Sequence, residues 1–111
     1  MLDDGVPHPL AATLSDFSIF RRVVNGCLIL RVTGELDLAT VPLLDRALHA
    51  TSELVTIDAR DLTFIDAHGI GALIAAHART GVSVRHARPG CRRVFALCAL
   101  GHLLDDGPPR S

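Results

Sequence analysis

Two strand-like segments joined by Asn25-Gly26 constrain this chain more than any other feature of its sequence. Residues 17–24 and 27–33 are rich in β-branched and aromatic side chains, as strands are. Asn-Gly supplies the two left-handed positions of a tight turn, so the segments are predicted to pair as an antiparallel hairpin. Apolar and polar residues alternate in the second segment, which predicts a sheet with one buried face.

Helical and strand patterns alternate after the hairpin. Short apolar strands are predicted at 54–58 and 82–86, and helices are predicted to begin near Thr40, Gly69 and Gly90. Strand–helix–strand order implies parallel pairing through right-handed crossovers. The predicted fold class is therefore α/β, with a four- to five-stranded mixed sheet and helices mainly on one face.

The ends of the chain differ in composition from its middle. Residues 1–12 carry prolines and a glycine without periodicity, and they are predicted to be a flexible arm. Residues 105–111 are predicted to be a flexible tail. The folded domain is expected to span 13–104, because 111 residues with 49% hydrophobic side chains suit one domain with one core.

Composition also excludes several classes of protein. A formal net charge of −1 gives no long-range attraction to nucleic acid or to an anionic membrane. No apolar run reaches membrane-span length and no signal peptide opens the chain, so a cytoplasmic location is expected. Cys27, Cys91 and Cys98 form no C-x-x-C pair and are predicted to be buried free thiols, with no metal and no cofactor.

The segment 63–79, TFIDAHGIGALIAAHAR, holds the main candidate site. A tight turn, Asp66 to Gly69, leads directly into a helix, and a helix N-terminus presents unpaired N–H groups and a positive dipole end. Asp66 is the predicted N-cap. The loops 34–37 and 58–69 both follow parallel strands, so they are expected to lie side by side at the carboxyl edge of the sheet, where partners and ligands usually bind.

Three stretches carry a resemblance to a known family. VTGELDLATVPLLDRAL, LVTIDARDLTFIDAHGIGALIAAHAR and CRRVFALCALG are similar to the STAS domain of bacterial anti-sigma factor antagonists, over nearly the whole of residues 15–104. The shared motifs are G-E-L-D before a helix, an Asp that ends the next strand, and I-D-x-x-G-I-G at the start of the second helix. The resemblance implies a single STAS-like domain.

The resemblance further implies a role in transcription regulation by partner switching, as a binding protein and not an enzyme. Such antagonists bind an anti-sigma factor that is a GHKL-type serine kinase, which frees a sigma factor for the stress response or another programme. The implied partner-binding residues flank the two loops: Glu35, Asp37, Asp66, Ala67, His68, Gly69, Ile70 and Gly71.

In the antagonists that this chain resembles, phosphorylation of a serine in a D-S-S-G turn breaks the complex with the anti-sigma factor, which is also the kinase. Here Ala67 and His68 occupy the serine positions, so no phosphoacceptor is expected there. Thr63 is a weak substitute, because a threonine at a strand start is usually structural. The resulting hypothesis is an antagonist that its kinase cannot inactivate.

Two other functions remain open. One is a STAS subunit of a lipid-transport ABC ATPase or of a larger sensory assembly. The other is a small nucleotide-binding or hydrolytic domain that uses Asp58, Asp66 and His68. The sequence lacks a nucleophile elbow, a Walker-type phosphate loop and an H-x-x-x-H spacing, so an enzyme is the weaker interpretation.

Overall fold

A computed structural model describes residues 8–14, 16–49 and 54–105. In these residues the strands and helices follow one another in the order β1 (His8–Leu14), β2 (Phe17–Val24), β3 (Cys27–Leu36), α1 (Val41–His49), β4 (Val55–Asp58), β5 (Leu62–Ile65), α2 (Ala67–Thr80), β6 (Val82–Arg85), α3 (Pro89–Leu97) and a 3-10 turn, Gly101–Leu103. None of the helices in these residues combines the length and hydrophobicity that crossing a bilayer requires.

The predicted hairpin is confirmed. β2 and β3 pair antiparallel, with Val24 opposite Cys27. Asn25 and Gly26 form the turn with φ values of 50° and 80°, which are the left-handed conformations that a two-residue hairpin loop needs.

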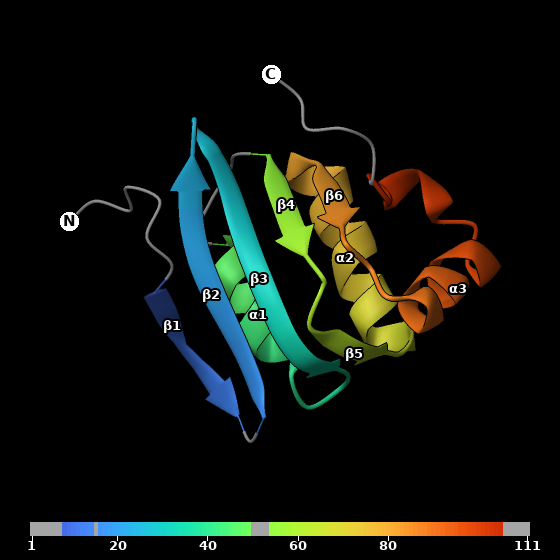
Figure 1. The fold of residues 1–111 in the computed structure, drawn as a ribbon, viewed down its shortest axis with the longest axis horizontal. Helices are drawn as coiled ribbons and strands as arrows, with labels where there is room; N and C mark the ends of the chain where they lie inside the picture. The colour runs from blue at the N-terminus through green and yellow to red at the C-terminus, as the bar shows by residue number, and fades with distance from the viewer. Residues whose placement is uncertain (1–7, 15, 50–53, 106–111) are drawn as a thin grey trace.

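The parallel part of the sheet is also confirmed. β4 pairs parallel to β3, with Leu28 opposite Val55, and β6 pairs parallel to β4. The strand order is β1-β2-β3-β4-β6, and β5 pairs with the C-terminal part of β3. Figure 1 shows this mixed sheet face-on, with α1 and α2 behind it.

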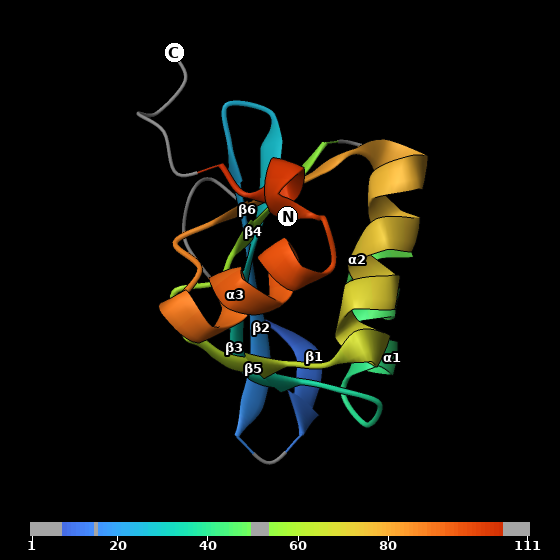
Figure 2. The same ribbon diagram turned by 90° about the vertical axis from the view of Figure 1, so that its right-hand side faces the viewer.

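The core lies between the sheet and these two helices. Figure 2 shows α1 and α2 together on one side of the sheet. Leu28, Leu30 and Val32 of β3 point to that side, and they pack in one cluster with Leu44 of α1 and Leu73 of α2. One face of the sheet is therefore sealed by helices, as the alternation in the second strand predicts.

Two strands were not predicted. The flexible arm predicted over 1–12 is wrong for residues 8–12, because His8–Leu14 pairs antiparallel with β2; residues 1–7 lie outside the described residues. Pro9 is tolerated there because β1 is an edge strand, which needs fewer backbone donors. The loop predicted over 58–69 contains β5, which has only four residues.

Three smaller predictions also need correction. Cys27 and Cys98 are exposed, because one lies at the hairpin turn and the other ends α3; only Cys91 of the three is buried. Burial raises the pKa of the Cys91 thiol. Asp105 belongs with the domain and not with the tail, since its N–H donates to the Val84 carbonyl at 2.8 Å.

Candidate functional site

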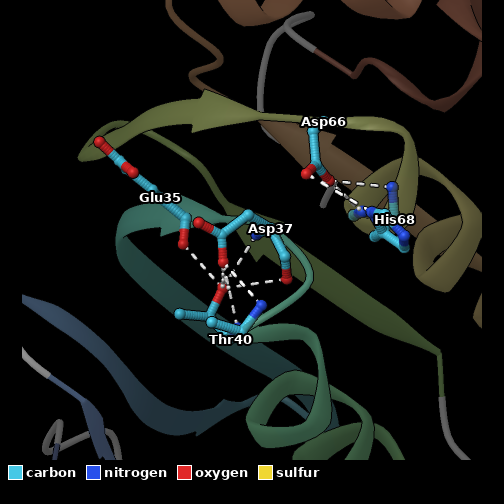
Figure 3. Close-up of polar contacts among 7 residues, drawn as sticks. Glu35, Asp37, Thr40, Asp66 and His68 are labelled. Carbon is cyan, nitrogen blue, oxygen red and sulfur yellow. Dashed lines mark hydrogen bonds and ion pairs between the residues drawn. The ribbon is translucent and has the colours of Figure 1, made fainter.

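The carboxyl ends of β3 and β5 lie side by side, which brings the two predicted loops together. β5 pairs parallel to β3, with Leu36 opposite Ile65. The Asp66 N–H then donates to the Leu36 carbonyl at 3.2 Å. Figure 3 shows the two loops as neighbours, and the short strand β5 is what aligns them.

Asp37 and Thr40 fix the loop between β3 and α1. The Asp37 carboxylate accepts hydrogen bonds from the backbone N–H groups of Ala39 and Thr40, at 3.0 and 3.2 Å. The Thr40 hydroxyl donates to the Glu35 carbonyl at 2.8 Å and accepts from the Asp37 N–H at 3.0 Å. Thr40 is only 6% exposed, so these bonds are shielded from water and hold the loop in one shape. Thr40 directly precedes α1, as predicted, and its carbonyl accepts from the Leu43 and Leu44 N–H groups, but its hydroxyl bonds backward along the chain and does not cap the helix.

Asp66 is the N-cap of α2, as predicted. Its Oδ1 accepts from the backbone N–H groups of His68 and Gly69, at 2.9 and 3.1 Å. The Ile70 N–H donates to the Asp66 carbonyl, so the donors of this first turn are largely used within the chain. Desolvation opposes ionisation, but the Gly69 and His68 N–H groups and the His68 ring outweigh it and hold the pKa of Asp66 below its ordinary value.

His68 occupies an exposed position beside that carboxylate. Its Nδ1 lies 3.6 Å from Asp66 Oδ2, and its side chain is 56% exposed. The two groups form an ion pair when the imidazole is protonated. Ala67, one residue earlier, is also exposed and offers no polar group.

The two glycines of G-I-G have different surroundings. A Cβ on Gly69 would lie 2.8 Å from Ile65 Cγ1 and 2.9 Å from both Leu36 Cγ and the Leu36 carbonyl oxygen. A Cβ on Gly71 would meet nothing within 4 Å. Gly69 is therefore required for packing inside the fold, whereas the fold places no demand on Gly71.

The predicted site residues thus separate into two groups. Gly69 and Ile70 are buried and face the core. Five others besides the capping Asp66, which is itself partly exposed, reach the surface at the joined loops: Glu35, Ala67, His68 and Gly71 are exposed, and Asp37 is partly exposed. We call these five residues together with Asp66 the loop-end surface. Asp58 lies elsewhere, in an ion pair with Arg60, which leaves the predicted catalytic grouping of Asp58, Asp66 and His68 without support.

A hollow of about 550 Å³ adjoins the loop-end surface. Carboxylates and hydroxyls from both sides of β3 surround it: Asp16, Thr33, Glu35, Asp37, Thr40, Asp61 and Thr63. No basic side chain lines it within the described residues. The sequence gave no signal for the hollow, because its lining residues are far apart in the chain. Asp16, Thr33 and Asp61 come together only when β2, β3 and β5 pair in register.

Leu38 is a further surface residue that sequence reasoning missed. It lies in the loop before α1, beside Asp37, and its side chain is 65% exposed. The available signal was its place between Asp37 and Ala39, outside both the strand and helix patterns.

Solved structures share this architecture. An anti-sigma factor antagonist from Mycobacterium paratuberculosis is 24% identical, with 87% of this chain and 91% of that one covered and a TM-score of 0.72. The antagonist SpoIIAA in its unphosphorylated form is 22% identical over 83% and 88% of the two chains, with a TM-score of 0.68. Phosphorylated SpoIIAA of Bacillus is 20% identical over 83% and 91%, with a TM-score of 0.64.

At these identities the likeness shows the fold. No curated protein sequence shows significant similarity to the chain. The family model described as "Mlab, STAS domain" matches residues 20–105, which is most of the folded region. The strand order, the joined loops and this match together show that the chain belongs to the STAS domain family.

Proposed function

We propose that this protein is an anti-sigma factor antagonist, a binding protein that docks an anti-sigma factor through the loop-end surface and so releases a sigma factor. The observation that carries the proposal is the junction of the two loops, in which the Asp66 N–H bonds to the Leu36 carbonyl. Structural neighbours with the same fold are anti-sigma factor antagonists. The loop-end surface is acidic and largely exposed, and hydrogen bonds from Asp37 and Asp66 hold its loops, which suits a protein partner.

We further propose that the partner is of the serine-kinase type and that phosphorylation does not inactivate this chain. Ala67 and His68 carry no hydroxyl. The Thr63 hydroxyl donates to the Gly34 carbonyl at 3.1 Å and borders the acidic hollow. A phosphate on Thr63 would break that bond and place about two negative charges among carboxylates, which disfavours Thr63 as a replacement acceptor.

The test compares the natural chain with His68→Ser. Each is incubated with the anti-sigma factor and ATP, then measured by intact mass and by binding. We expect no phosphate on the natural chain and a lasting complex. On His68→Ser we expect one phosphate and loss of the complex, because about two charges would be added beside Asp66 and Asp37.

Ala75→Ser is the matched control, since it puts the same hydroxyl on an exposed position of α2 about two turns further on. It should remain unmodified and bound. Phosphate on the natural chain, with release of the partner, would contradict the missing switch while leaving the docking role intact. Specific capture of an ABC ATPase in place of an anti-sigma factor would contradict the docking role and establish the transport alternative.

A further inference from the structure

The second face of the sheet has no helix over it among the described residues. In Figure 1 this face looks toward the viewer, with β2, β3, β4 and β6 in front of the helices. Strand register sets which side chains share it. Phe20, Arg31, Asp58 and Arg85 form one row across the four strands, and Arg22, Ile29, Thr56 and Ser83 form the next. We call these two rows the open sheet face.

Arginines dominate the part of this face that reaches water. The Arg31 side chain is 48% exposed, against 35% for Asp61, with which it forms an ion pair. The Arg60 side chain, just beyond β4, is 50% exposed, against 14% for its partner Asp58. In both pairs the arginine is the more exposed partner, and the carboxylate holds its guanidinium group in place.

Arg22 strengthens this arrangement. It is exposed, and it belongs to none of the ion pairs found within the described part of the chain. It stands opposite Ile29, while Arg31 stands opposite Phe20 on the neighbouring row. Phe20 and Ile29 are only partly buried, so an apolar floor lies between two outward arginines. Arginine beside apolar surface is typical of the centre of protein interfaces.

The charge of this face is opposite to that of the loop-end surface. Glu35, Asp37 and Asp66 give the latter a negative character, and the chain as a whole has a formal net charge of −1. Arginines on and beside this face outnumber its carboxylates, so the face has a net positive charge although the chain is slightly acidic: Arg22, Arg31, Arg60 and Arg85 stand against Asp58 and Asp61. A chain with this net charge has no long-range attraction for nucleic acid. The positive charge of the open sheet face therefore favours an acidic protein segment as its partner.

We propose that the open sheet face, centred on Arg22 and Arg31, is a second docking surface that binds an acidic segment of a protein. Guanidinium groups pair carboxylates with two parallel hydrogen bonds, and the apolar floor accepts the aliphatic parts of the segment. The surface lies on the opposite side of the sheet from α1 and α2. It can therefore be occupied while the loop-end surface holds its own partner.

The probe for this surface is a short peptide rich in Glu and Asp, with a Gln/Asn peptide of the same length as the neutral comparison. Binding to the isotope-labelled full chain is followed by NMR shifts and by fluorescence anisotropy. We expect the acidic peptide to shift the amides around Arg22, Ile29 and Arg31 and the neutral peptide to leave them unchanged. Arg22→Glu should weaken binding by at least about tenfold, because it replaces attraction by repulsion at the centre of the surface.

Arg93→Glu is the matched control, since it makes the same change of charge at an exposed position of α3. Arg22→Gln is a second variant that removes charge without adding any, and it should weaken binding less. The proposal is overturned if Arg93→Glu weakens binding as much as Arg22→Glu, or if the shifts map to another surface. It is also overturned if duplex DNA or anionic vesicles shift the same amides at physiological salt as strongly as the peptide does. Gly71→Ala, on the loop-end surface, should leave peptide binding unchanged, which separates this proposal from the first.

Discussion

The first turn of α2 has an inner side that is packed against the sheet and an outer side that faces solvent, and the two are under different packing constraints. On the inner side, Gly69 lies so close to β3 and β5 that a Cβ would not fit. The Asp66 carboxylate accepts hydrogen bonds from backbone N–H groups of the same turn. On the outer side, His68 and Gly71 are exposed, and the space around Gly71 is open. Packing inside the fold therefore dictates the inner half of the motif and places no such demand on the outer half.

Gly69→Ala is the strongest test of the inner side. The new Cβ would press on the Leu36 carbonyl oxygen, which is also the acceptor of the Asp66 N–H. We expect a loss of about 2 kcal/mol in the free energy of unfolding, as overpacking a rigid site usually causes. Urea unfolding followed by circular dichroism measures it. An unchanged midpoint would mean that the two loops are less tightly joined than the contact distances indicate.

Asp66→Asn tests the charge on the inner side separately from the cap. Asparagine caps helices about as well as aspartate, so the hydrogen bonds can persist while the negative charge is lost. The folded pKa of Asp66 is below its ordinary value of 3.8, so its ionised form stabilises the fold at neutral pH. That contribution is present above pH 3.8 and is lost as the pH falls through the lower folded pKa.

The natural chain should therefore be more stable than Asp66→Asn at pH 7, and the gap should close in strong acid. Thermal melts of both proteins between pH 7 and pH 2 measure it. Asp45→Asn, on the partly buried side of α1, is the comparison for general charge effects. A gap that stays constant across this range would contradict the assigned ionic role.

Gly71→Ala has the smallest expected effect on stability, and that effect has the opposite sign. Alanine favours a helix over glycine by up to about 1 kcal/mol, and nothing in the fold obstructs it. The variant should melt slightly higher than the natural chain. If the outer side is the docking side, it should also bind the anti-sigma factor more weakly, because a methyl group then stands in the contact. Higher stability with unchanged affinity for the anti-sigma factor would show that Gly71 does not contact the partner.

The sequence predicted the elements whose local signals are strong. Asn25-Gly26 identified the hairpin, and Asp66 identified the N-terminal end of α2 correctly. It also predicted that the two loops meet, because parallel strands end on the same edge. The family resemblance supplied the role proposed for that edge, which no periodicity could have given.

Other features depend on partners distant in the chain. β1 was missed because it contains Pro9, and β5 because its two middle residues are both exposed, so it lacks the alternation of the equally short β4 and β6. The exposure of Cys27 was missed because a strand pattern does not tell which face lacks a cover. The acidic hollow arises from residues on three strands. The different surroundings of Gly69 and Gly71 were equally invisible, since the sequence shows both simply as glycine.

The last described residues also bear on how the molecule behaves in solution. Leu104 forms a parallel bridge with Val84, and Asp105 donates its N–H to the same residue. Together they occupy backbone groups along the outer edge of β6. An uncovered strand edge readily recruits strands from other molecules, so a chain cut before Leu103 should aggregate even with its helices intact. The 3-10 turn and the two residues after it therefore help to keep this protein monodisperse, and a fusion partner or affinity tag belongs beyond Asp105.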